Sequence, residues 1–148
     1  MKIGFWLTEM GRAGRGMNEP GWLAGALALL AGPALAADPV GNWLVADKTA
    51  IIRIAPCAQA YCGTIAWTSQ PGTDEHNPDP AKRDRPIVGT QILLGMTPVA
   101  ADRWDGEIYN PENGKTYTGH LILRQPDVLR VEGCLLFFCG GENWTRTR

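Results

Sequence analysis

Few side chains in this 148-residue sequence could carry out a reaction. Beyond residue 36 there is one serine, Ser69, and no nucleophile elbow surrounds it, so a serine hydrolase triad is not predicted. A carboxylate pair such as Glu107 with Glu112 could serve glycoside hydrolysis, but their spacing in the sequence does not select it. We therefore predict no catalytic residue.

An acidic stretch around one of the two histidines is a candidate for cation binding. His76 lies near Asp74, Glu75 and Asp79, and these groups can ligate a hard or borderline cation. Their spacing lacks the D-x-[DN]-x-[DN]-G pattern of calcium loops. The other histidine, His120, is expected within a strand, exposed or hydrogen-bonded. We predict no metal site and no cofactor.

Polar and aromatic residues near two turns are better suited to holding a small ligand. Arg83 and Arg85 could clamp a carboxylate or phosphate, although pairing with Asp79 and Asp84 would fasten their loop to the fold instead. Aromatic rings with amides between 109 and 117 suit a barrel mouth, although they could equally cap a core. The predicted ligand-binding residues are Asn77, Asp79, Arg83, Arg85, Tyr109, Asn110 and Tyr117.

The elements that must position these residues are strands. Short runs of alternating apolar residues are separated by Gly, Pro, Asn and Asp, and one short helix is expected near 80–85. We predict an all-β fold, an antiparallel up-and-down barrel of about eight strands, because closure leaves no edge strand. The expected strands are 43–45, 50–55, 61–68, 89–96, 104–109, 115–124, 128–133 and 142–147.

The longest connection between the expected strands is 70–87, with four prolines and seven charged residues. Long ordered loops in small domains are often functional, and the alternative is a solvated connector. We expect residues 77–85 of this loop to gate one end of the barrel.

Four cysteines, an even number in a small exported domain, predict disulfides. The pairs Cys57–Cys62 and Cys134–Cys139 are favoured because each brackets the junction of two expected strands, where cross-strand neighbours come close. Other pairings stay open at this stage. A zinc site is disfavoured, since zinc ribbons prefer two residues between paired cysteines.

The N-terminal residues 1–36 have the pattern of a signal peptide. A basic region precedes the apolar run 22–30, and Ala34 and Ala36 fit the small-x-small cleavage pattern. We predict one exported domain, 37–148, in the periplasm or outside the cell. A net charge of −1 gives no basic field for nucleic acid, and no later apolar run is long enough to span a bilayer.

Several motifs in a fixed order resemble the bacterial exported family called domain of unknown function 2147. The resemblance covers nearly all of 37–148 and implies a small lipocalin-like barrel with no established reaction. His76 departs from it, because a lysine is expected there. The motifs are G-x-W at 41–43, I-A-P-C at 54–57, Y-C-G at 61–63, H-N-P-D-P at 76–80, R-x-R-P-I-V-G at 83–89, G-E-I-Y-N-P-E-N-G-K-T-Y at 106–117 and W-T-R at 144–146.

The G-x-W motif and the arginine of the last strand also resemble the lipocalin and calycin pattern. In that pattern the guanidinium packs over the tryptophan ring and closes the barrel, a cation–π contact. The resemblance assigns these structural roles to Trp43 and Arg146, with Trp144 beside them on the last strand.

Three functions stay open on the sequence alone. The first is burial of a small hydrophobic or amphipathic ligand, or an envelope component, in the barrel lumen. The second is a structural or interaction module of the cell envelope with a filled core, and the third and least favoured is a hydrolytic enzyme. A continuous apolar cavity of at least about 300 Å³ would favour the first.

Overall fold

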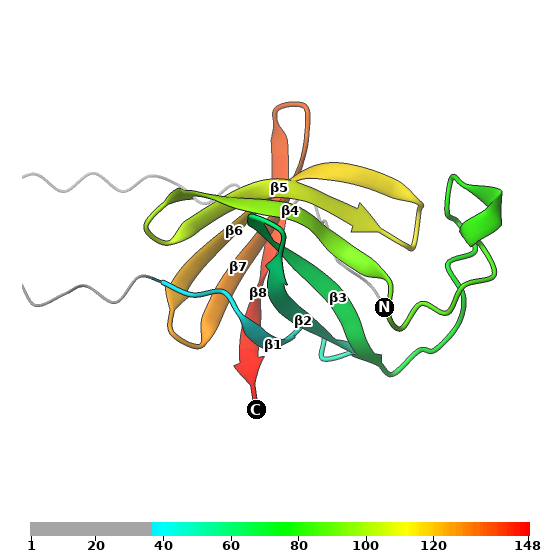
Figure 1. Cartoon of the computed structure of the whole chain (residues 1–148), viewed down its shortest axis with the longest axis horizontal. Helices are drawn as coiled ribbons and strands as arrows, with labels where there is room; N and C mark the ends of the chain where they lie inside the picture. The colour runs from blue at the N-terminus through cyan, green and yellow to red at the C-terminus, as the bar shows by residue number, and fades with distance from the viewer. Residues whose placement is uncertain (1–36) are drawn as a thin grey trace, which may run out of the picture.

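A computed structural model describes residues 37–148 as a closed barrel of eight strands (Figure 1). Each strand pairs antiparallel with the next, and β8 pairs with β1, so the predicted up-and-down barrel is confirmed. The predicted signal peptide lies outside the described residues. The strands are β1 (Gly41–Leu44), β2 (Ala50–Cys57), β3 (Ala60–Thr68), β4 (Gln91–Ala100), β5 (Arg103–Asn110), β6 (Lys115–Gln125), β7 (Val128–Leu135) and β8 (Phe138–Thr147).

Two strands extend well beyond their expected limits. β4 continues to Ala100, and β8 begins at Phe138 rather than at 142. In both cases the hairpin loop has only two residues, and pairing persists up to it, as between Leu135 and Phe138. The run 135–138 is apolar throughout, so it lacks the alternation that marks a strand in the sequence.

The remaining regular element is the short 3₁₀ helix η1 (Pro80–Lys82), within the expected helical segment 80–85. Asp79 caps it by accepting a hydrogen bond of 3.0 Å from the backbone nitrogen of Ala81. Within residues 37–148, no helix has the length and apolar character needed to cross a membrane.

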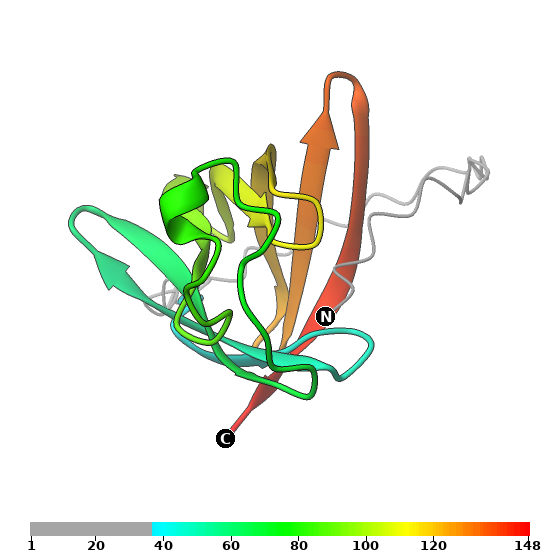
Figure 2. The same ribbon diagram turned by 90° about the vertical axis from the view of Figure 1, so that its right-hand side faces the viewer.

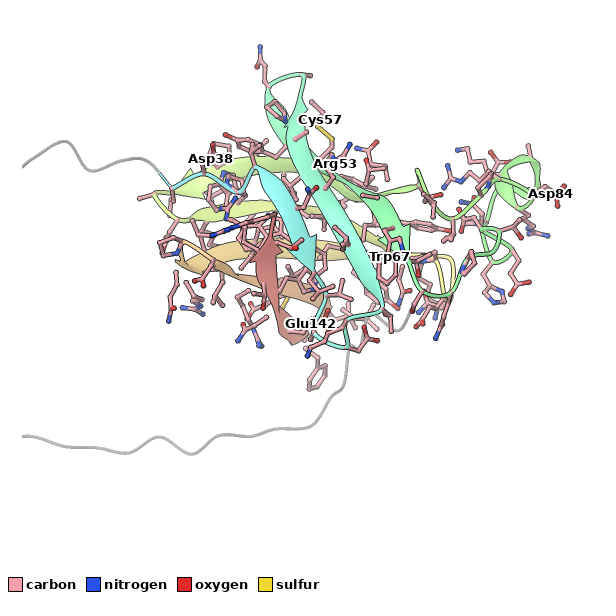
Figure 3. All side chains as sticks on the ribbon, turned by 90° about the horizontal axis from the view of Figure 1, so that it is seen from below. Asp38, Arg53, Cys57, Trp67, Asp84 and Glu142 are labelled. Atoms are coloured by element: carbon pink, nitrogen blue, oxygen red, sulfur yellow. A yellow bond between two sulfur atoms is a disulfide. The ribbon has the colours of Figure 1, made fainter. Side chains whose placement is uncertain are left out.

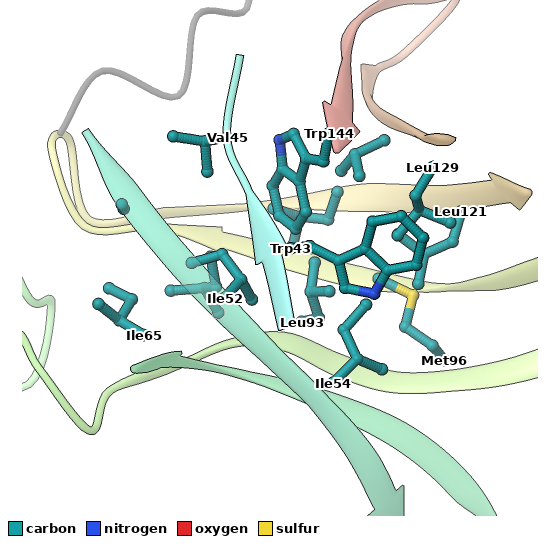
Figure 4. Close-up of a cluster of buried hydrophobic side chains, with 14 of the residues drawn as sticks. Trp43, Val45, Ile52, Ile54, Ile65, Leu93, Met96, Leu121, Leu129 and Trp144 are labelled. Carbon is teal, nitrogen blue, oxygen red and sulfur yellow. The ribbon is translucent and has the colours of Figure 1, made fainter. Parts of the chain in front are cut away.

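Inward-facing apolar side chains from all eight strands meet in one buried cluster (Figure 4). Gly106 and Gly119 face each other across β5 and β6, and Met96 packs over both. A Cβ on Gly119 would lie 2.9 Å from Met96 Cε and 2.5 Å from Ile108 Cγ1. Side chains therefore fill the space that these glycines leave. The largest fully buried side chains are Trp43, Trp144, Ile52, Ile54, Ile65, Ile92, Leu93, Met96, Ile108, Leu121, Leu129 and Val45.

Arg146 fastens the first strand to the last. Its guanidinium carbon lies 4.3 Å from the centroid of the Trp43 ring, which confirms the contact expected from the lipocalin pattern. The same guanidinium donates to the carbonyl oxygens of Val40, of Asp38 at 2.9 Å and of Pro126 at 2.8 Å. It thus joins the N-terminal segment, the β6–β7 turn and β8.

The glycine of the G-x-W motif is required by the same contact. Gly41 has φ +139°, and a Cβ at this position would lie 2.7 Å from Nη1 of Arg146. A larger residue would displace the guanidinium, so the motif and the arginine form one structural unit.

Both favoured disulfides are confirmed. Cys57–Cys62 joins β2 to β3, and Cys134–Cys139 joins β7 to β8 with a Cα–Cα distance of 4.0 Å. The second pair is directly opposite in register, two residues from the hairpin tip on either strand.

We expect Arg146→Ala to lower the free energy of unfolding of residues 37–148 by about 2 kcal/mol, because it removes the cation–π contact and three hydrogen bonds. Urea titration measures this change. Arg146→Lys should recover only part of the loss, since an ammonium group lacks the planar donor fork. The control is Arg124→Ala on an exposed position of β6, and an equal loss in both alanine variants would contradict this role.

Candidate functional site

The connection between β3 and β4 is an ordered loop whose two ends pair with each other through backbone hydrogen bonds and form a neck. The backbone nitrogen of Asp74 donates to the carbonyl of Arg85 at 3.0 Å, and Ile87 donates to Gly72 at 2.9 Å. We call residues 72–87 the strap loop. Figure 2 shows it in front of one end of the barrel, with the β5–β6 hairpin beside it.

A buried carboxylate joins the strap loop to the barrel. Asp74 is fully buried, and its Oδ1 accepts a hydrogen bond of 2.6 Å from the hydroxyl of Tyr109 at the end of β5. Its Oδ2 accepts from Nδ2 of Asn77 at 2.7 Å and from Nε and Nη2 of Arg85 at 3.0 and 2.7 Å. Asn77 also donates to the Tyr109 oxygen at 3.1 Å. These four residues form what we call the clasp.

The clasp changes the protonation behaviour of its members. Burial raises the pKa of Asp74, but the hydrogen bonds from Tyr109, then from Asn77 and Arg85, outweigh burial and hold that pKa below its ordinary value. Burial, and then the neighbouring carboxylate, raise the pKa of the Tyr109 phenol to about 12. At neutral pH the clasp is therefore an ionised acid held by a neutral phenol, an amide and a guanidinium.

The strap loop also rests on the β5–β6 hairpin. Gly114 has φ +68°, and a Cβ there would overlap the carbonyl oxygen of His76. Within the hairpin, the Asn110 side chain accepts from the backbone nitrogen of Glu112 at 2.9 Å, and Asn113 donates to the Tyr117 hydroxyl at 2.9 Å. Asn110 and Tyr117, both predicted as ligand residues, thus make contacts that shape the hairpin.

A groove of about 560 Å³ opens between the strap loop and this hairpin. The side chains of Ile87 and Pro111 in its lining are buried, whereas Glu75 and His76 at its edge are exposed and lie 3.5 Å apart. The groove is thus amphipathic. It is lined by Gln70, Gly72, Thr73, Glu75, His76, Ile87, Pro111 and Glu112.

The predicted partners of the loop arginines are wrong. Arg85 pairs with Asp74, and Arg83 donates from Nε to the carbonyl of Asn77 at 2.8 Å. Asp79 instead caps the 3₁₀ helix, and Asp84 lies on the outer side of the loop (Figure 3). The physical reason is the paired neck of the strap loop, which places Asp74 beside Arg85.

Of the seven predicted ligand residues, the clasp brings together Asn77, Arg85 and Tyr109. From the sequence, Asp74 was expected only as a candidate metal ligand, and its partners, which are up to 35 residues away, could not be recognised. The groove residues Gly72 and Ile87 were not predicted either. The prolines that flank both ends of the long loop were the available signal for a paired neck.

His120 is hydrogen-bonded, one of the two states expected for it. Its Nδ1 lies 2.8 Å from Oδ1 of Asp105, which also accepts from Nε of Arg103 at 2.8 Å. Among residues 37–148, His120 forms a group of potential metal ligands with Cys134 and Cys139, all within 4.8 Å. Because these cysteines share a disulfide, the group offers no thiolate.

Residues 41–146 match the family described as "Uncharacterized protein conserved in bacteria (DUF2147)". The chain belongs to this family. The fold of this DUF2147 domain is similar to that of a solved Helicobacter pylori protein, whose title says that it belongs to the lipocalin family. The TM-score is 0.68 at 17% identity, over 76% of this chain and 84% of that chain, and such a likeness shows the fold alone. No curated protein matches the chain.

The lowered pKa of Asp74 predicts a specific acid sensitivity. A carboxyl whose pKa is depressed by folding stabilises the fold above its unfolded pKa of about 3.9, and this stability is lost as the pH falls through the folded-state pKa. We expect Asp74→Asn to cost about 2 kcal/mol at pH 7 and to flatten the decline of unfolding free energy below about pH 4. Asp84→Asn is the matched control, and an undiminished decline in Asp74→Asn would contradict the clasp.

The raised pKa of Tyr109 predicts the opposite behaviour at alkaline pH. The neutral phenol is favoured by folding, so its contribution is complete below an unfolded pKa of about 10 and is lost as the pH rises toward about 12. Phenolate absorbance should contain a component near pH 12 that Tyr109→Phe removes. Persistence of that component in the variant would show that another tyrosine produces it.

Proposed function

We propose that this DUF2147 domain is a non-catalytic binding module, which takes up a small amphipathic ligand in the groove between the strap loop and the β5–β6 hairpin. The observation that carries the proposal is the groove itself. Its volume of about 560 Å³ falls within the range of about 300–1,000 Å³ that is usual for small-molecule sites.

The barrel interior is a poor alternative site. Trp43, Trp144 and Met96 are fully buried within it, and the spaces beside its glycines are occupied by neighbouring side chains. A ligand in the lumen would have to displace close-packed core residues, which destabilises a protein. The ligand was expected in the barrel lumen. We propose instead that it binds at the outer surface of one barrel end.

The groove lining indicates the chemistry of the ligand. Ile87 and Pro111 offer apolar surface, and Glu75 offers carboxylate oxygens at the exposed edge. The ligand that fits is amphipathic, with its apolar part on Ile87 and Pro111 and a polar group that donates hydrogen bonds toward Glu75. Because one side of the groove is open, part of the ligand would stay in contact with water.

The clasp gives the groove a fixed wall. Residues 77–85 were expected to gate one end of the barrel, yet Asn77 and Arg85 at the two ends of this segment are bonded to the buried carboxylate of Asp74. Opening the loop would break these bonds and leave polar groups unpaired, which is unfavourable. A wall that is already ordered reduces the entropy lost on binding, so we propose a preformed site rather than a moving gate.

The leader pattern and the cysteines support an exported location for this function. Two disulfides are typical of an oxidising compartment, and a signal peptide at residues 1–36, as predicted, would direct export. We propose that the domain acts in the periplasm or outside the cell, where an envelope component is a source of amphipathic ligands.

A second candidate function is an interaction module of the envelope with a filled core. The packed interior is the observation that favours it, and it predicts that no small molecule is retained. The native mass spectrometry experiment described next separates the two functions.

Gly72→Phe should block the groove without disturbing the fold. A Cβ on Gly72 would meet nothing within 4 Å, so an aromatic ring can occupy the groove. Native mass spectrometry of the exported protein should show a co-purified small molecule. Gly72→Phe should lower its occupancy, because loss of at least roughly 1.4 kcal/mol of binding free energy raises the Kd at least about tenfold.

The matched control is Val99→Phe, which adds the same ring at an exposed position on the opposite end of the barrel. It should retain the ligand. Equal occupancy in Gly72→Phe would place the ligand outside the groove, and no retained molecule in the unmodified protein would favour the interaction module.

A further inference from the structure

The β7–β8 hairpin ends in four consecutive large apolar side chains that face solvent. Leu135, Leu136, Phe137 and Phe138 are 63%, 85%, 95% and 66% exposed. The other exposed large apolar side chains among residues 37–148 are single, and none exceeds 55%. Figures 1 and 2 show this hairpin, in orange and red, projecting beyond the rest of the barrel.

The backbone of this tip would be easier to form with other residues. Leu136 is the first of the two loop residues between the paired Leu135 and Phe138, and its φ is +55°. Glycine or asparagine adopts this conformation at much lower cost than leucine, and both are the usual residues of such hairpin loops. The Cys134–Cys139 disulfide joins the strands directly below the tip. Leu136 is thus exposed to solvent with a strained backbone conformation, on a hairpin whose two strands are cross-linked by the disulfide.

The tip is also free of charge. From Gly133 to Gly141 the sequence is GCLLFFCGG, and Glu132 and Glu142 are the nearest ionisable residues on the two strands. A segment that is both apolar and uncharged can leave water for hydrocarbon without transferring an ion.

We propose that this tip inserts into the hydrocarbon boundary of a lipid bilayer and anchors the domain at a membrane surface. Two residues beyond the disulfide on each strand, at about 3.3 Å per residue, reach about 7 Å. This matches the depth of about 5–10 Å to which interfacial segments enter a membrane.

A protein partner or a second copy of the chain fits the tip less well. A standard interface buries about 800 Å² on each partner and uses some 20–30 residues, whereas this tip is a narrow projection of four. A bilayer needs no complementary pocket and accepts such a projection wherever it touches.

The direction of the strands places the tip and the strap loop at the same end of the barrel. The β3–β4, β5–β6 and β7–β8 connections all lie at that end, because consecutive strands run in opposite directions. The proposal is independent of whether the groove binds a ligand.

The test is flotation with neutral phosphatidylcholine vesicles, using residues 37–148. This segment supplies every strand, both disulfides and the core, and it omits the apolar run 22–30 that would bind lipid by itself. The domain should float with the vesicles. Leu136→Asn combined with Phe137→Ser should lower the partition coefficient on the order of a hundredfold, because two exposed apolar side chains are lost.

The control is Trp67→Ser with Val99→Ser, which removes two exposed apolar side chains elsewhere and should float like the unmodified domain. Because the tip carries no charge, flotation should be the same at high salt, and loss of binding at high salt would overturn the proposal. Absence of flotation, or unchanged flotation of the tip variant with an intact thermal transition, would also overturn it. So would a dimer in sedimentation that only the tip variant lacks, since it would assign the tip to a second copy.

Discussion

The carboxylate of Asp74 is completely withdrawn from water, and an ion in that position persists only if its oxygens are hydrogen-bonded. Tyr109 at the end of β5 supplies one bond, and Asn77 and Arg85 of the strap loop supply the others. The long loop is therefore part of the folded domain rather than a solvated connector. Its attachment forms one wall of the groove, so the candidate site depends on this single buried charge.

The packed interior explains why binding is assigned to the surface. Eight strands enclose a space that Trp43, Trp144, Met96 and their neighbours occupy. The proposed ligand site therefore lies outside the barrel, between the strap loop and the β5–β6 hairpin. A domain held to a membrane by the apolar tip of the β7–β8 hairpin would lie close to the source of amphipathic molecules.

The features that could be predicted from the sequence are those encoded by near neighbours. Cys134 and Cys139 flank a hairpin, and the alternation of 115–124 marks a strand without reference to the rest of the chain. The contact between Arg146 and Trp43, which closes the barrel, was expected only from the resemblance to the lipocalin pattern. The partner of Arg85 could not be predicted in this way, because it follows from the pairing at the loop neck. The groove was also missed, since its walls come from segments about 40 residues apart.

We propose that an amphipathic ligand binds in the groove fixed by the clasp and not inside the barrel. The most direct test is nuclear magnetic resonance of the labelled domain, titrated with a short alkyl glucoside below its micelle concentration. Binding in the groove should shift the amide signals of Gly72, Thr73 and His76 and leave the methyl signals of Ile52, Leu93 and Leu121 unchanged. Shifts at those interior methyl groups, with none at the groove, would contradict it.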